Sequence, residues 1–69
     1  MSLKWSDAPD IGYELFEAHA GVDPLSVPFT RLHEWVLALE EFADDPKASN
    51  EGLLEAIQMA WLEEFRAED

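Results

Sequence analysis

The side chains of this chain that could do chemistry are its carboxylates: 16 Asp and Glu stand against 4 Lys and Arg in 69 residues, a net charge of -12. Asp10, Glu14 and Glu17 recur at i, i+4 and i+7, which stacks three like charges on one face of a helix. Carboxylate oxygens suit hard cations, and a surface of one sign attracts partners of the opposite sign. The sequence therefore indicates a surface that meets cations or a basic protein.

Two further acidic clusters follow apolar, helix-like segments. Near position 42 stand Glu40, Glu41, Asp44 and Asp45, and at the end of the chain stand Glu63, Glu64, Glu68 and Asp69. The end of a helix is already negative and favours cations, so carboxylates there cost stability. A simple solvated surface is the alternative interpretation. We interpret the repulsion as one that binding of a basic partner or a hard cation relieves.

Charge geometry selects the candidate residues. The predicted metal ligands are Asp10, Glu14, Glu17, Glu40, Glu41, Asp44 and Asp45. The predicted partner contacts are Asp10, Glu17, Glu40, Asp44 and Asp45. Sites made only of surface carboxylates would be shallow and water-filled, so we expect weak metal binding.

Catalytic chemistry has little support in the sequence. The chain has no cysteine, which excludes thiolate metal sites, disulfides and thiol catalysis. His19 and His33 lack a second histidine at ligand spacing, and we expect His33 to be half-buried with its polar groups satisfied. Residues 44–55 begin with Asp and end with Glu as an EF-hand loop does, but Pro46, Ala48 and Ser49 stand where that loop needs two oxygen ligands and a turn glycine. Without a nucleophile motif or a glycine-rich phosphate loop, we expect a protein that is not an enzyme.

Length and composition predict one folded domain, residues 1–69. A chain of this size buries only about 60% of its unfolded surface, so large aromatic residues must supply much of the core. The 48% apolar content separates it from disordered acidic segments. There is neither a long apolar run nor a signal-peptide pattern, and we expect a cytoplasmic protein with no membrane partner.

Apolar periodicity predicts three helices. The first begins at Asp7 and stops at Gly21; the second is capped by Thr30 and carries an apolar stripe to Phe42; the third follows an N-cap at Ser49 or Asn50 and runs to about Arg66. Residues 1–6 and 27–29 alternate as short strands do. The predicted fold is mainly α, a three-helix domain with short N-terminal and edge strands.

Several segments of the sequence closely resemble those of the IscX family, also called YfhJ. Members of this family are small acidic proteins of bacterial iron-sulfur cluster assembly. The segments are LKWSD at 3–7, VPFTRLHEW at 27–35, DDPKASNE at 44–51, and LEAI at 54–57 followed by WL at 61–62. The likeness runs without an apparent gap from about Leu3 to Glu64.

The resemblance implies a modified winged-helix arrangement and a monomer that acts as a non-catalytic adaptor or regulator. It implies binding to an IscS-type cysteine desulfurase, weak binding of Fe²⁺ by acidic groups, and competition with a frataxin-like protein and ferredoxin. Lacking cysteine, the chain can hold no cluster by its own thiolates. Nucleic acid is an unsuitable partner for so acidic a surface. The alternatives are an iron donor to the assembly scaffold and a generic acidic protein-interaction module.

Overall fold

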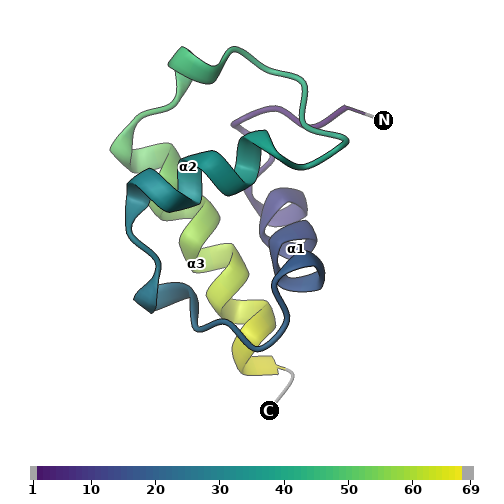
Figure 1. The fold of residues 1–69 in the computed structure, drawn as a ribbon, viewed down its shortest axis with the longest axis vertical. Coiled ribbons are helices and arrows are strands. Elements are labelled where there is room, and N and C mark those ends of the chain that lie inside the picture. Colours follow the sequence, from purple (N-terminus) through teal and green to yellow (C-terminus); the bar gives the residue numbers. More distant parts are fainter. Residues whose placement is uncertain (1, 68–69) are drawn as a thin grey trace.

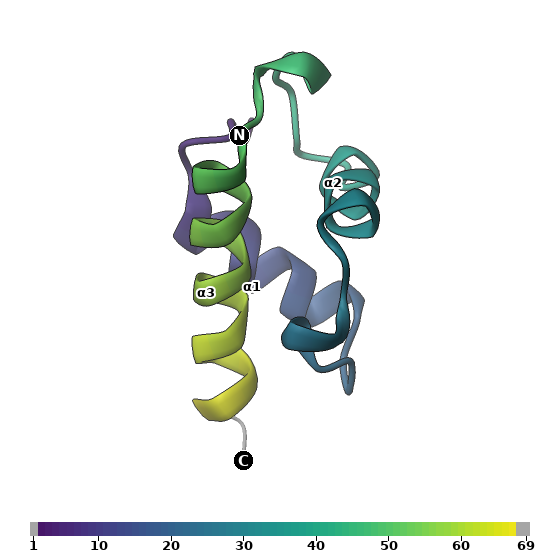
Figure 2. The same cartoon turned by 90° about the vertical axis from the view of Figure 1, so that its left-hand side faces the viewer.

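The computed structural model describes residues 2–67 and is mainly helical, as predicted (Figure 1). Its elements are α1 (Ala8–Ala18), η1 (Pro24–Ser26), α2 (Phe29–Leu37), η2 (Pro46–Ala48) and α3 (Glu51–Ala67), where η marks a short 3-10 helix. α1 packs extensively along α3, while α2 touches both more lightly. Figure 2 shows α2 beside α3, with α1 behind them. Within residues 2–67, no helix is long and apolar enough to cross a membrane.

Local sequence signals set most of the helix ends. Pro9 lies in the first turn of α1, and Gly21 follows that helix with φ of 87°, a left-handed conformation that favours glycine. Asn50 caps α3, since its side-chain oxygen accepts a hydrogen bond from the Leu53 backbone N–H at 2.8 Å. The predicted cap at Asn50 is confirmed, whereas α1 ends at Ala18 with His19 as its C-cap, earlier than the predicted stop at Gly21.

The second helix differs from its prediction at both ends. It begins at Phe29 with Pro28 as N-cap, so Thr30 lies inside the first turn instead of capping it. It ends at Leu37, well before Phe42. Phe42 leaves the helical path because its ring packs edge-on against Trp5, with ring centres 4.6 Å apart. A tertiary contact therefore overrides the helical periodicity of this segment.

The two predicted strands do not form among residues 2–67. Leu3 makes only an isolated parallel bridge with Phe42, and the remaining end of that predicted strand, Met1, lies outside the described residues. Val27 follows η1, and Phe29 already begins α2. Pro28 supplies no backbone N–H for a strand ladder and its fixed φ suits a helix start. The winged-helix arrangement stays a prediction.

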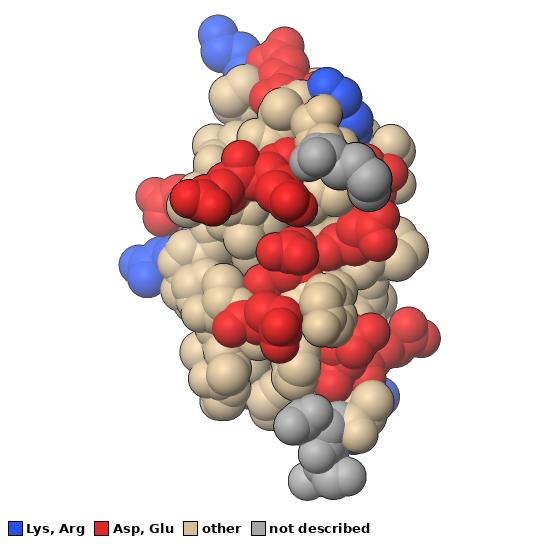
Figure 3. Space-filling view, turned by 90° about the vertical axis from the view of Figure 1, so that its right-hand side faces the viewer, with Lys and Arg blue, Asp and Glu red and all other residues tan. Residues whose placement is uncertain are grey.

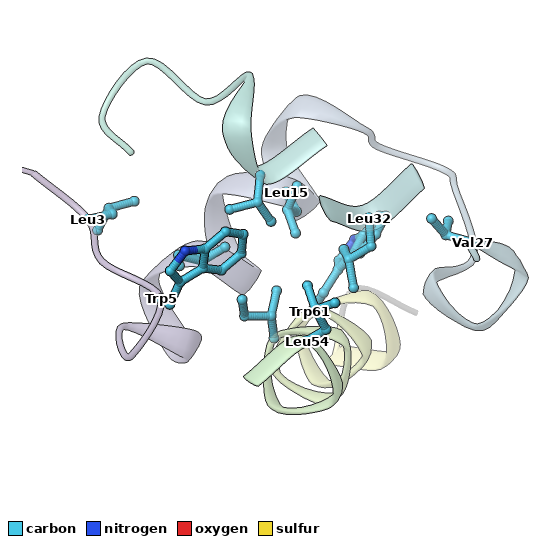
Figure 4. Packing of buried hydrophobic residues seen from close by; sticks show 10 residues of the cluster. Leu3, Trp5, Leu15, Val27, Leu32, Leu54 and Trp61 are labelled. Atoms are coloured by element: carbon cyan, nitrogen blue, oxygen red, sulfur yellow. The ribbon is translucent and has the colours of Figure 1, made fainter. Parts of the chain in front are cut away.

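One apolar cluster joins the three helices and the N-terminal segment (Figure 4). Its buried members are Leu3, Trp5, Ile11, Leu15, Val27, Leu32, Val36, Leu54, Ile57 and Trp61. Trp35 packs at the edge of this cluster and is only half-buried; its ring stacks on His19 at 3.8 Å. Burial lowers the pKa of the His19 imidazole. The C-terminal end of α1 is thus fixed to α2 by an aromatic stack.

Gly12 allows α1 and α3 to approach closely. A Cβ atom at this buried position would lie 2.7 Å from the Trp61 backbone nitrogen and 2.8 Å from Ala60. The Trp61 nitrogen and the Ala60 carbonyl carbon belong to the backbone of α3, and the Ala60 Cβ is fixed to that backbone. None of these atoms can rotate away, so any side chain would force the two helices apart. Glycine is needed here for space; the missing side chain permits the largest helix contact in the fold.

We expect Gly12→Ala to destabilise the protein by about 1–3 kcal/mol, the usual cost of overpacking a well-packed contact. Gly52→Ala is the matched control, because its added Cβ meets only the Asn50 side-chain oxygen, at 3.3 Å. Urea unfolding followed by tryptophan fluorescence measures both. Equal stability of the two variants would show that the α1 and α3 backbones can separate without cost.

Candidate functional site

The candidate residues lie on two supports: α1, and the segment 38–50 between α2 and α3, which we call the acidic loop. The N-terminal segment holds the acidic loop in place. The Leu3 backbone N–H donates to the Glu41 carbonyl at 2.7 Å, and the Leu3 carbonyl accepts from Ala43 N–H at 2.9 Å. Lys4 Nζ adds a hydrogen bond to the Ala43 carbonyl. The acidic loop is therefore ordered by backbone pairing although it carries four carboxylates.

Trp5 completes this attachment from the core side. Its backbone N–H donates to Asp44 Oδ2 at 3.0 Å, and its indole Nε1–H donates to the Asp45 carbonyl at 2.7 Å. The residue is only 2% exposed, and its ring stacks on His33 with centres 5.2 Å apart. A buried residue whose backbone N–H and indole N–H are both paired across the chain fixes the acidic loop against the helices.

His33 supports the same loop from α2. Its Nε2 lies 2.8 Å from the Pro46 carbonyl oxygen, which can only accept, so this nitrogen donates the proton. The side chain is half-buried and hydrogen-bonded, as predicted. It also lines a hollow of about 300 Å³ with Phe29, Thr30 and Leu54. None of the predicted acidic site residues lines that hollow.

The structure gives Asp44 and Asp45 a role within the fold. Asp44 Oδ1 accepts the Asp45 backbone N–H at 2.7 Å, while its Oδ2 accepts from Trp5. The Trp5 hydrogen bond, aided by that of Asp45 and by the charge of Lys4, lowers the pKa of the Asp44 carboxyl. Asp45 Oδ1 accepts the Lys47 N–H at 2.9 Å and so starts η2. Sequence reasoning missed the contact between Asp44 and Trp5 because Trp5 lies far away in the chain.

The side chains of the other five candidate residues form no hydrogen bonds of this kind. They are Asp10, Glu14 and Glu17 on α1, and Glu40 and Glu41 in the acidic loop. Their side chains make no hydrogen bond or ion pair with any other residue in 2–67. Glu14 is half-buried, and the other four are exposed. These carboxylates are free to meet a partner.

Figure 3 shows the side of the molecule on which α1 lies, and Asp and Glu side chains spread over much of it. Lys and Arg side chains appear only at its margins. In residues 2–67 there is a single ion pair, between Arg31 and Glu34, with a distance of 3.4 Å from Arg31 Nε to Glu34 Oε1. The negative charge of residues 2–67 is thus almost wholly unneutralised by ion pairs with side chains of the same range.

The predicted metal ligands are not brought into one centre. Among residues 2–67, no group of three or more Asp, Glu, His or Cys side chains is placed to hold a metal ion. Glu68 and Asp69 of the C-terminal acidic cluster lie outside the described residues. The arrangement can offer neighbouring carboxylates along α1, such as Asp10 and Glu14 at i, i+4, but no preformed metal cage.

We expect Asp44→Asn to lower stability at neutral pH, because an amide has one oxygen to accept the two N–H groups that the carboxylate accepts. The folded-state pKa of Asp44 lies below its ordinary value of 3.8, which we take for the unfolded chain. Its stabilisation is therefore present above that value and is lost as the pH falls through the folded-state pKa. The stability of wild type should approach that of the variant as acid is added.

Urea unfolding at pH 7, 5 and 3 tests this convergence. Glu40→Gln removes the same charge from an exposed side chain in the same loop, and its stability should stay close to that of wild type. Asp44→Asn and wild-type curves that remain parallel across the pH range would contradict the assigned role of Asp44.

Comparison with known proteins agrees with the resemblance seen in the sequence. The family model described as iron-sulphur cluster assembly matches residues 3–66. An uncharacterized protein of Pseudomonas aeruginosa is 53% identical over 64 residues, which cover 93% of this chain and 97% of the relative. The matched region contains α1, the acidic loop and nearly all of α3. The chain belongs to the IscX (YfhJ) family of iron-sulfur cluster assembly proteins.

Proposed function

We propose that this protein is a non-catalytic adaptor that binds cysteine desulfurase through its acidic surface and so regulates iron-sulfur cluster assembly. The observation that carries the proposal is the set of carboxylates on α1 and in the acidic loop that make no hydrogen bond or ion pair within residues 2–67. Family membership supports the process, and the charge supports the mode of action. The chain lacks cysteine, so it can receive no persulfide sulfur and must act by binding.

The charge distribution explains why docking would be favourable. Carboxylates at i, i+4 on a helix repel each other by about 0.2–0.5 kcal/mol per pair, and a basic surface replaces that repulsion with attraction. Association of this kind is fast at low ionic strength and weakens as salt screens the charges. A basic patch used in this way would also be closed to other acidic partners, which supports competition with a frataxin-like protein or ferredoxin.

Ferrous iron enters the proposal as a weakly held ligand. Carboxylates suit a hard cation, but the described residues provide no group of three ligands, so binding would use pairs of side chains and water. Asp10, Glu14 and Glu17 provide such pairs on α1. Iron bound there would cancel part of the charge that attracts the desulfurase. We therefore propose that iron weakens docking.

Calorimetric titration of the protein into purified cysteine desulfurase, at low and physiological salt, should show saturable binding that salt weakens. Ferrous iron added under anaerobic conditions should reduce the affinity. The double variant Asp10→Asn, Glu17→Gln should bind about 2- to 30-fold more weakly at low salt, since each exposed ion pair contributes roughly 0.2–1 kcal/mol.

The control is the single variant Glu55→Gln, which removes an exposed carboxylate from α3. If the α1 side is the docking surface, Glu55→Gln should change the affinity much less than either α1 substitution made singly. Equal losses would mean that only the net charge matters, and absence of binding by wild type would overturn the adaptor function.

A further inference from the structure

The outer face of α1 presents an aromatic ring between two carboxylates. Asp10, Tyr13 and Glu17 stand at i, i+3 and i+7, so they follow one another along the same side of the helix. All three are exposed, and Tyr13 retains 47% of its accessible surface. On the opposite side, Ile11 and Leu15 are fully buried. The helix therefore buries one face and leaves a face of mixed aromatic and acidic character without a partner in the described fold.

Tyr13 differs from the other exposed large apolar residues in its chemical setting. Among residues 2–67, those are Leu25 in η1, Leu37 at the end of α2 and Met59 on α3. Only Tyr13 has a π face, and it has a free carboxylate one turn away on each side. A planar cation can lie over such a ring while its N–H groups reach carboxylate oxygens.

Arginine fits this arrangement better than lysine does. Its guanidinium is flat, stacks on aromatic faces and presents several N–H donors in one plane, whereas the ammonium of lysine is a compact, strongly hydrated point charge. α1 carries no Lys or Arg of its own to fill the position. A second copy of this chain is a poor occupant, because two bodies each of net charge -12 repel.

We propose that Tyr13, with Asp10 and Glu17, is the receptor for an arginine side chain of the basic partner, and that this contact gives the acidic surface a preference for arginine over lysine. The proposal rests on the adaptor function, which it deepens by naming the chemistry recognised. Tyrosine and arginine are both enriched among residues that dominate binding energy at protein interfaces.

Two basic peptides of equal length and charge, nona-arginine and nona-lysine, serve as probes of the full-length protein in calorimetric titrations. Both should bind, and arginine should bind more tightly. Tyr13→Leu should reduce the arginine preference by about 2- to 5-fold, as expected for loss of one exposed cation–π contact. Tyr13→Phe keeps the ring and should keep the preference. Thermal unfolding of each variant confirms that the fold is retained.

Leu25→Ala is the control for loss of an exposed apolar side chain elsewhere, and the arginine preference should be unchanged in it. An identical preference in wild type, Tyr13→Leu and Tyr13→Phe would assign it to carboxylates alone and overturn the inference while leaving the adaptor function intact. Failure of wild type to bind either peptide would overturn both. A concentration-dependent dimer in sedimentation that Tyr13→Leu disrupts would also overturn the inference, since a second copy would occupy this face.

Discussion

The attachment of Trp5 to the acidic loop is the constraint on which the rest of the structure depends. One buried residue pairs its backbone N–H with the Asp44 side chain and its indole N–H with the Asp45 carbonyl, while its ring contacts His33 and Phe42. Between Leu37 and Glu51, the only regular element is the short η2. Without Trp5, the loop would keep only the hydrogen bonds from Leu3, Lys4 and His33, while its carboxylates repel one another and are well hydrated.

Side-chain length separates the carboxylates that build the fold from those that remain free. Asp7, Asp23, Asp44 and Asp45 each accept a hydrogen bond from a backbone N–H in a turn or loop. The short side chain of aspartate reaches the backbone of nearby residues, whereas the longer and more mobile side chain of glutamate gains less from doing so. Asp10 differs from these aspartates: it lies in the first turn of α1, and its side chain makes no hydrogen bond within residues 2–67. The surface open to a partner is consequently rich in glutamate.

Local patterns in the sequence predicted three helices, the Asn50 cap and the turn at Gly21, because these features depend on residues close in the chain. They placed the end of the second helix too late and predicted strands that do not form. The early end of α2 and the reduction of the first strand to an isolated bridge reflect the contacts of Phe42 with Trp5 and Leu3, which join positions that sequence periodicity treats separately. The second predicted strand is absent because Pro28 caps α2, which begins at Phe29. Asp44 was selected by charge yet not recognised as a hydrogen-bond acceptor for Trp5, because Trp5 lies far away in the chain. The exposure of Tyr13 is equally invisible in composition, since most aromatic residues of so small a domain belong to its core.

The unneutralised charge is itself a functional argument. A protein selected only for stability would be expected to intersperse the two signs of charge, yet the described residues contain one ion pair between exposed side chains. Lys4 points its ammonium at the Ala43 carbonyl and contributes to holding the loop. Self-repulsion persists in the free protein at a cost to stability, which its small core can barely offset. That cost is explained if the electrostatic field of the negative charge acts at long range, where it attracts a basic partner and orients it before contact. A few side chains on α1 would then select what is bound.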